Sequence, residues 1–174
     1  VGDDPKNWVD ETLGYKDLNP YIYPDLEEVN KRKIKALYFS YFFKWDVLQN
    51  YKYVSSKINF KTAHRNRTDG TFTNYDSLDD KMDNLYYYMQ FIKFGFGRSL
   101  RDASRLIQLG HLKKEKAKEF ISKYDSEFPK TYLNDVLDFF EINLQELQDI
   151  IDKHRNYEIW NRNAKGWELI NKVE

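Results

Sequence analysis

The stretch DGTFTNYDSLDDKMDNLYYYMQFIKFGFGR, residues Asp69–Arg98, decides how this chain folds. It opens with a threonine-rich turn, continues through acids into a long aromatic segment, and ends in two glycines and an arginine. Acidic side chains favour the positive end of a helix dipole, and glycine favours the left-handed conformation that ends a helix. The stretch therefore predicts a long helix that begins at Ser77 and is ended by Gly95 and Gly97.

This predicted helix is apolar on more than one side. One apolar stripe has helical spacing and consists of Leu78, Met82, Leu85, Met89 and Ile92. The aromatic residues that lie roughly opposite are Tyr87, Phe91 and Phe94. A polar stripe beside the first consists of Asp79, Asp83, Tyr86, Gln90 and Lys93. We therefore expect a central, buried helix whose polar stripe needs partners.

Amphipathic helices follow this stretch. We expect Ser99 to begin one, with Asp102 three residues on as a variant of the capping box, and Gly110 to close it. Helical spacing of apolar residues then indicates helices around residues 117–124 and 133–140. A last helix is expected after Asn143, which has a glutamate at the capping-box position. The residues expected on its core face are Leu147, Ile150, Ile151 and His154.

The residues before Asp69 are less regular. Prolines punctuate residues 1–33, and a short helix is expected at residues 26–33. The run Ile34–Phe43 is short, aromatic and almost wholly apolar, which predicts a strand buried on both faces. Asp46 is expected to cap a helix that extends to Lys57.

These elements predict an α-dominated α+β fold. We expect a helical C-terminal portion with one or two strands that complete a Rossmann-like α/β sheet, whose other strands belong to an N-terminal half missing from this chain. Residues 1–33 would form a loop-rich segment and residues 34–110 the strand and helices that contribute to the candidate site. Residues 111–174 would form a helical C-terminal subdomain.

Composition excludes several classes of protein. Lys+Arg and Asp+Glu both number 28, so there is no basic excess of the kind that accompanies nucleic-acid binding. The chain has no Cys, which excludes disulfide and thiolate-zinc sites and suits a reducing, cytoplasmic location. No apolar run approaches the roughly 20 residues of a membrane helix, and the first residues do not resemble a signal peptide. We expect neither a nucleic-acid nor a membrane partner.

Charged residues around the predicted helix form candidate sites. Lys93, Arg98 and Arg101 have the charge to bind phosphate, and the glycines would let backbone amides approach it. A glycine-broken connection with solvated charges explains them equally well, since no Walker motif is present. Asp79 and Asp80, with Asp83, have the chemistry to hold Mg²⁺. Acids that simply decorate a helix N-terminus are the more common explanation.

The chain resembles the C-terminal half of the N-acetyl sugar amidotransferases. These enzymes serve bacterial surface-polysaccharide synthesis and the pseudaminic and legionaminic acid pathways. The resemblance covers most of residues 34–160, and its most specific part is the run from Thr71 to Arg98. The segments that carry it are YFFKWD (41–46), TDGTFTNYDSLDDKMDNLYYYMQFIKFGFGR (68–98), DAS (102–104), KYDSEFP (123–129) and HRNYEIW (154–160).

The resemblance implies an ATP-pyrophosphatase of the adenine nucleotide alpha-hydrolase type. Such an enzyme would use ATP and Mg²⁺ to adenylate an N-acetyl oxygen and let ammonia displace AMP, which leaves an acetamidino group. Ammonia would come from a glutaminase subunit, together with a cyclase-like subunit, both similar to those of histidine biosynthesis. The family's SGGxDS pyrophosphate loop is absent from this sequence, so the isolated chain is expected to be inactive.

The resemblance and the chemistry together suggest roles for single residues. Lys93 and Arg98 are expected to contact phosphate during catalysis, because cations stabilise a leaving pyrophosphate. The residues expected to bind the sugar or its phosphates are Asp46, Thr71, Thr73 and Arg101. Asp79 and Asp80 are the candidates for Mg²⁺.

Two other functions fit the sequence. The first is a non-catalytic helical module that binds a protein partner through its many aromatic side chains, which make up 17% of the residues. The second is a carbohydrate-binding module, which would bind sugar without ATP.

Overall fold

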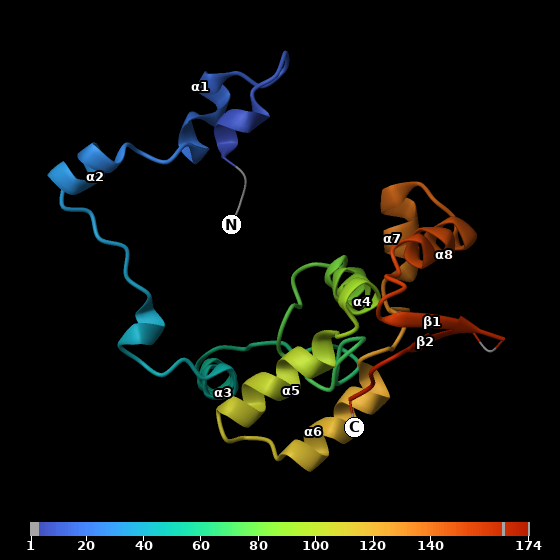
Figure 1. The fold of residues 1–174 in the computed structure, drawn as a ribbon. Coiled ribbons are helices and arrows are strands. Elements are labelled where there is room, and N and C mark those ends of the chain that lie inside the picture. Colours follow the sequence, from blue (N-terminus) through green and yellow to red (C-terminus); the bar gives the residue numbers. More distant parts are fainter. Residues whose placement is uncertain (1–3, 165, 174) are drawn as a thin grey trace. The chain divides into compact units, whose positions relative to one another are not determined.

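The computed structural model describes residues 4–164 and 166–173. By compactness the chain divides into two units, Val1–Trp45 and Asp46–Glu174, which are described separately. Figure 1 shows both units as ribbons. The predicted segment boundaries after residues 33 and 110 were drawn from changes in composition along the sequence, not from compactness. They stay predictions.

The first unit consists of short helical turns with little core. Its elements are η1 (Pro5–Trp8), α1 (Tyr15–Leu18), η2 (Asn19–Tyr21), α2 (Leu26–Lys31) and η3 (Phe39–Tyr41). Asp25 caps α2 by accepting a hydrogen bond from the Glu27 amide at 2.8 Å, so the short helix expected here is confirmed. Among the described residues of this unit, only Pro5 and Leu18 are buried.

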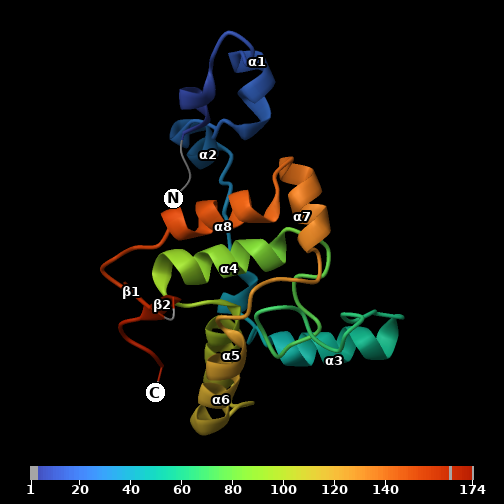
Figure 2. The same ribbon diagram turned by 90° about the vertical axis from the view of Figure 1, so that its right-hand side faces the viewer.

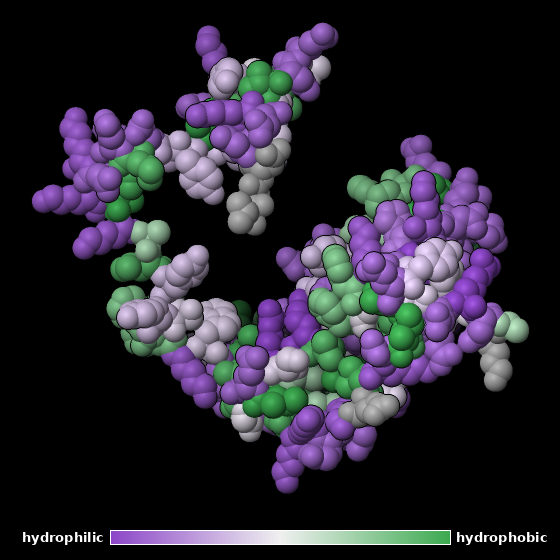
Figure 3. All heavy atoms as spheres, in the orientation of Figure 1, coloured by the Kyte–Doolittle hydropathy of each residue, from purple (hydrophilic) through white to green (hydrophobic). Residues whose placement is uncertain are grey.

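The strand predicted at Ile34–Phe43 is wrong. Its backbone turns at η3, where the Phe42 amide donates to the Phe39 carbonyl at 3.0 Å. Side chains of this segment are exposed, for example Tyr38 at 85%. A buried strand needs neighbours for its backbone N–H and C=O groups, and no described residue supplies one here. At the place of η3, pale and green spheres of intermediate and apolar residues lie at the surface (Figure 3).

The second unit holds the longer helices and a hairpin. Its elements are α3 (Val47–Lys57), α4 (Asp83–Phe94), α5 (Arg98–Gln108), α6 (Lys114–Tyr124), α7 (Leu133–Phe140), α8 (Leu144–Lys153), β1 (Trp160–Asn163) and β2 (Gly166–Leu169). The strands β1 and β2 pair antiparallel, with Trp160 opposite Leu169. The α-dominated α+β class is thus confirmed. The predicted relation to a Rossmann-like sheet stays a prediction.

The central helix α4 starts later than the sequence indicated. It begins at Asp83 rather than Ser77, because Ser77 has a left-handed backbone, with φ of 51°, that a helix cannot contain. The Asp80 carboxylate accepts from the Met82 amide at 2.7 Å and so supports the turn before the helix. The end is as expected, since Gly95 adopts the left-handed conformation just after Phe94.

The main core forms where α4, α7, α8 and β1 meet. Figure 2 shows α8 alongside α4, with α5 and α6 adjacent to each other below them. The buried side chains of this core are Phe91, Ile92, Val136, Leu147, Ile151 and Trp160. A second, smaller core lies between α5 and α6 at Ala103, Ala117 and Ile121. Burial of these apolar surfaces supplies the main driving force for folding this unit.

The cap and core face predicted for the last helix can be compared with α8. The Asn143 side chain accepts from the Glu146 amide at 3.1 Å, and Glu146 accepts from the Asn143 amide at 2.8 Å, so the capping box is confirmed. Leu147 and Ile151 are buried as expected. Ile150 and His154 are exposed, so the predicted core face is too wide.

The hairpin is fixed to the central helix by one buried hydrogen bond. The indole Nε1 of Trp160 donates to the Ile92 carbonyl at 2.7 Å, and the Trp160 ring meets Phe91 edge to face at 5.3 Å. Within the described ranges, no helix has the length and apolar character needed to cross a lipid bilayer.

Candidate functional site

The threonine-rich loop before α4 is held by one buried carboxylate, that of Asp102 on α5. The hydroxyls of Thr71 and Thr73 donate to Asp102 Oδ2 at 2.7 and 3.0 Å. Arg101 donates to Oδ1 through Nε at 3.1 Å and Nη2 at 3.0 Å, and Arg98 Nε lies 3.9 Å from Oδ2. We call these five residues the Asp102 cluster. Four of them were predicted as site residues, and the structure brings those four together.

Arg98 is enclosed within this cluster. Its side chain is fully buried, its Nη2 donates to the Asp76 carbonyl, and its guanidinium lies 5.0 Å from the Tyr87 ring centroid. Burial lowers the pKa of Arg98, and the Asp102 carboxylate opposes that shift. Its Nε and Nη1 have no hydrogen-bond partner among the described residues. Arg98 therefore offers no atom to solvent in this conformation, and its predicted contact with phosphate stays a prediction.

Tyr87 and Asp76 complete the surroundings of the two arginines. The Arg101 guanidinium lies 4.4 Å from the same Tyr87 ring, and Arg101 Nη2 donates to Asp76 Oδ2 at 2.8 Å. Nearby, the pKa of Tyr75 is raised to about 12, mainly by burial and secondly by the negative charge of Asp102. The sequence signal for this arrangement was an arginine and an aspartate four residues apart, Arg98 and Asp102, which places them on one face of a helix.

The other predicted site residues lie apart from this cluster. Asp46 caps α3 by accepting from the Gln49 amide at 3.0 Å, and its Oδ2 lies 2.7 Å from Nε2 of His111. Lys93 is exposed on the last turn of α4. Asp79 and Asp80 are exposed in the segment before α4. The predicted roles of these residues in catalysis or binding stay predictions.

The start of α5 already holds a carboxylate of the protein. Asp125 Oδ2 accepts from the Gly97 amide at 2.8 Å, and Oδ1 accepts from the Leu100 amide at 3.0 Å. Burial raises the pKa of Asp125, and these amides oppose that shift. The expected cap at Ser99 is wrong, because the helix begins at Arg98 with Gly97 as N-cap. The amides expected to meet phosphate are thus occupied by Asp125.

The described residues do not form a complete magnesium site. Nowhere in residues 4–164 and 166–173 do three or more acidic, histidine or cysteine side chains gather to hold a metal ion. Asp79 and Asp80 offer neighbouring carboxylates, one of which accepts from the Met82 amide. Magnesium takes six ligands and needs waters or substrate phosphates to complete such a pair. No step is therefore assigned to a metal at these residues.

A partly buried ion pair joins the threonine loop to the segment after α6. Both terminal nitrogens of Arg67 donate to the Glu127 carboxylate at 2.6 Å, and Glu127 also accepts from the Gly70 amide at 2.9 Å. Asp69 accepts from the amides of Lys130 and Thr131 at 2.9 and 2.8 Å. The loop thus has a fixed shape, set by residues some 60 positions away in sequence.

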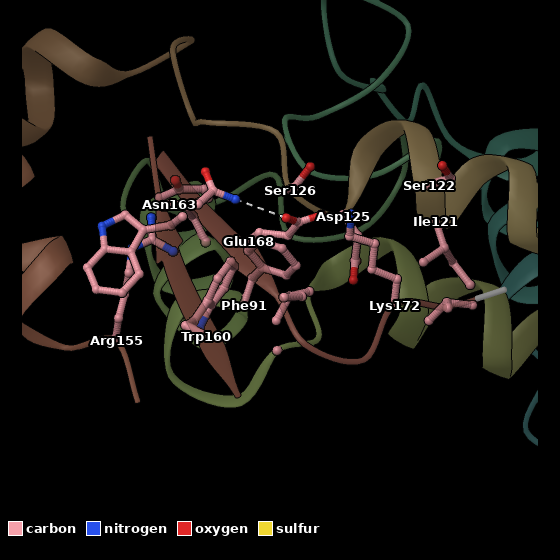
Figure 4. A pocket seen from close by; sticks show the side chains of 15 residues that line it. Phe91, Ile121, Ser122, Asp125, Ser126, Arg155, Trp160, Asn163, Glu168 and Lys172 are labelled. Carbon is pink, nitrogen blue, oxygen red and sulfur yellow. Dashed lines mark hydrogen bonds and ion pairs between the residues drawn. The ribbon is translucent and has the colours of Figure 1, made fainter. Parts of the chain in front are cut away.

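The second unit contains a pocket of about 600 Å³, within the range of about 300–1,000 Å³ typical of small-molecule sites. Figure 4 shows Ser122, Asp125 and Ser126 on one part of its wall, and Trp160, Asn163 and Glu168 of the hairpin on another. Helix α4 contributes aromatic side chains, Tyr88 and Phe91. No motif in the sequence indicates this pocket, because its walls come from segments distant along the chain.

Ion pairs and rings fix the hairpin side of the pocket. Glu168 accepts from Asn163 at 3.1 Å and from Lys172 at 2.5 Å. The Arg155 guanidinium lies 4.5 Å from the Trp160 ring centroid and 5.3 Å from that of Trp167. Its Nε also donates to Asp152 at 3.2 Å. Charge and aromatic surface are thus arranged around the pocket before any ligand binds.

The structure defines a mostly helical domain with a pocket between its central helix, the end of α6 and a C-terminal hairpin. Residues 69–174 match a family model described as the C-terminal domain of LPS biosynthesis protein WbpG-like proteins, and the chain belongs to this family. The match begins at the Asp69-Gly70 turn and includes the pocket and all of the Asp102 cluster. No curated protein matches the chain.

Proposed function

We propose that the chain is the C-terminal part of an ATP-dependent amidotransferase that converts the N-acetyl group of a sugar into an acetamidino group. The product would enter bacterial surface-polysaccharide or nonulosonic acid synthesis, such as that of pseudaminic or legionaminic acid. The observation that carries the proposal is membership of the lipopolysaccharide-biosynthesis family across residues 69–174. That range contains the run from Thr71 to Arg98 on which the resemblance to N-acetyl sugar amidotransferases depends.

The proposal extends to co-substrates and partners. ATP with Mg²⁺ would activate the amide oxygen of the sugar in the cytoplasm, and ammonia from a glutaminase subunit with its cyclase-like companion would replace AMP. The described residues here fit neither a phosphate cradle nor a metal site, as the occupied start of α5 illustrates. We therefore place ATP binding in a preceding part of the protein and assign no phosphate chemistry to the Asp102 cluster.

Within this proposal the residues of the chain, apart from Lys93, have positioning roles. The Asp102 cluster and the Arg67–Glu127 pair fix the threonine loop against α5 and the segment after α6. Lys93 is the predicted catalytic residue whose charge is open to a ligand, because it is exposed. In the full-length protein, this charge would stabilise the leaving pyrophosphate of ATP bound by the preceding part.

The test is pyrophosphate release by the full-length protein with ATP, an N-acetyl sugar and ammonia. We expect release that depends on both the sugar and ammonia. Lys93→Ala is expected to lower the rate by about 10²-fold. Lys153→Ala, which removes an exposed lysine from the last turn of another helix, should leave it within about twofold. Equal rates for the two variants would exclude Lys93 from catalysis, and absence of sugar-dependent release would refute the amidotransferase proposal.

A non-catalytic interaction module is the second candidate. The observation that favours it is the exposed aromatic segment of the first unit, in which Phe39, Phe42 and Trp45 are each more than half exposed. Exposed apolar patches of this kind often mark protein-binding surfaces. This candidate predicts no pyrophosphate release from the full-length protein under any of the conditions above.

A further inference from the structure

We propose that the pocket between α4, the end of α6 and the hairpin binds the sugar ring itself, as an uncharged 2-acetamido sugar. The inference rests on the proposed function for the class of sugar, but the site follows from the pocket. None of the residues predicted from the sequence as sugar ligands, Asp46, Thr71 and Thr73, lines this pocket.

The charges of the pocket favour a neutral ligand. Its cations are Arg155 and Lys172, and its anions are Asp125 and Glu168. Each is already paired within the protein. Arg155 pairs with Asp152, and Lys172 pairs with Glu168. Asp125 accepts from the backbone amides at the start of α5. A nucleotide or a phosphate would need unpaired cations, and would meet two carboxylates here. A ligand without charge avoids both costs.

The polar atoms of the pocket suit sugar hydroxyls and an amide. Carboxylates and serine hydroxyls accept hydrogen bonds from sugar hydroxyls, and Asp125, Glu168, Ser122 and Ser126 all belong to the lining. The indole Nε1 of Trp167 is buried without a hydrogen-bond partner among the described residues, although buried N–H donors are normally paired. Because the protein encloses this atom, it reports on a ligand that binds beside the Trp167 ring rather than bonding to that ligand.

The apolar part of the pocket suits the apolar parts of a 2-acetamido sugar. Tyr88 and Phe91 of α4 supply ring surface, against which the C–H face of a pyranose or an acetamido methyl group would pack. Trp167 meets Tyr157 edge to face at 5.4 Å, and the guanidinium of Arg155 lies beside it, so the position of the indole is set in advance. A site fixed in advance loses less ordering entropy when a ligand binds.

The four tryptophans of the chain provide the test. Each indole N–H gives one cross-peak in a ¹⁵N-correlated NMR spectrum of the 174-residue chain, and Trp→Phe variants assign the peaks. We expect N-acetyl-D-glucosamine, N-acetyl-D-galactosamine or N-acetyl-D-mannosamine to shift the Trp167 peak in a saturable way without ATP. The peaks of Trp8 and Trp45, in the first unit, should stay in place. Glucose and ATP should have little effect on any of them.

Two matched variants strengthen the design. Glu168→Gln, at an exposed position of the lining, should raise the dissociation constant at least about tenfold, because it removes a charged acceptor. Glu158→Gln, also exposed but outside the lining, should leave the constant unchanged. Unchanged dispersion of the other indole peaks shows that each variant has folded.

The outcomes separate this proposal from the amidotransferase proposal. If none of the three sugars shifts the Trp167 peak, or if ATP shifts it instead, the pocket is not the sugar site. Sugar-dependent pyrophosphate release by the full-length protein would then still support the amidotransferase. A saturable Trp167 shift without any pyrophosphate release would support the sugar site and refute the amidotransferase.

Discussion

Asp102 accepts hydrogen bonds from two threonines and lies within ion-pair distance of two arginines, all of them buried or partly buried. Removing its charge would leave Arg98 buried without a carboxylate, which typically costs about 3–5 kcal/mol. We expect Asp102→Asn to lower the free energy of unfolding by this amount in urea titration. Asp79→Asn, at an exposed carboxylate of the same region, should change it by less than about 0.5 kcal/mol. Similar effects of the two variants would show that the cluster adds no stability.

The Arg67–Glu127 pair makes a pH-dependent contribution. Burial tends to raise the pKa of Glu127, but the hydrogen bonds from Arg67 and the Gly70 amide outweigh it and hold the pKa below its ordinary value of 4.5. A carboxylate with a lowered folded-state pKa stabilises the fold above its unfolded-state pKa, and this stabilisation fades as the pH falls through the lowered value. The pair should therefore be fully effective at neutral pH and weaken in acid.

Comparison with Glu127→Gln isolates this contribution from other titrating groups. At pH 7 the variant should be less stable than the parent chain by about 1.5–3 kcal/mol, since the hydrogen bonds lost involve a charged acceptor. The difference should shrink as the pH falls below about 4.5, measured by urea unfolding at a series of pH values. A difference that stays constant down to pH 3 would contradict the assignment, and Glu158→Gln serves as the control.

Sequence reasoning identified the arginines and threonines of the Asp102 cluster but not the residue that joins them. Thr71, Thr73, Arg98 and Arg101 stood out as polar groups that ordinary core packing does not need. Asp102 was interpreted as part of a cap, because a serine three residues earlier fits that local pattern. Asp102 could cap the helix after Ser99 or pair with Arg98 on the same helix face. It does not act as the cap, because the Asp125 carboxylate accepts hydrogen bonds from the amides at the start of α5. That contact joins residues distant in sequence, and a single sequence does not reveal it.

The approach of the α4–α5 connection to the segment after α6 depends on a glycine. A Cβ added at Gly97 would lie 2.9 Å from both the backbone oxygen and Oδ1 of Asp125, so the neighbouring chain would have to move. We expect Gly97→Ala to destabilise the protein by about 1–3 kcal/mol, as overpacking does. Gly14→Ala, whose Cβ would meet its nearest atom at 3.5 Å, should be close to neutral in the same thermal unfolding experiment. A neutral Gly97→Ala would show that this contact can relax freely.

Local signals predicted helices well and the strand badly. The caps at Asp46 and Asn143 and the glycine at the end of α4 act through neighbours in sequence, so they were visible. The start of α4 was missed because Ser77 has a left-handed backbone, which a serine in the sequence does not indicate. The apolar run Ile34–Phe43 satisfied the pattern of a buried strand, yet a strand is stable only with partners.

The two units differ in how much core they contain. Both apolar cores are formed by residues of the second unit, whereas the first unit buries only Pro5 and Leu18 among its described residues. A chain shortened to residues 46–174 should therefore unfold cooperatively, with a melting temperature within about 3 °C of the parent's. A fragment of residues 1–45 should show no cooperative transition in circular dichroism. Loss of cooperative unfolding in the shortened chain would contradict this assignment of the cores.

The helix-dominated fold class could be predicted from the sequence, because each helix has its own amphipathic pattern of apolar residues. The pocket did not, because its walls come from α4, the end of α6 and the hairpin, and only the fold brings these together. Its polar residues Asn163 and Glu168 lie in a segment with no recognisable motif.

Because the hairpin is synthesised after the helices, it determines when the pocket can form. Proteins are made from the N-terminus onward, so helices α4 to α8 have all been synthesised before Trp160 is added. Until the Trp160 indole reaches the Ile92 carbonyl, the pocket lacks one of its walls. Phe91 also lacks its edge-to-face partner. A nascent chain that stops short of residue 160 would thus lack the hairpin wall and be unable to hold a ligand in this pocket. Any binding activity located there can therefore arise only after the residues of the hairpin have been added.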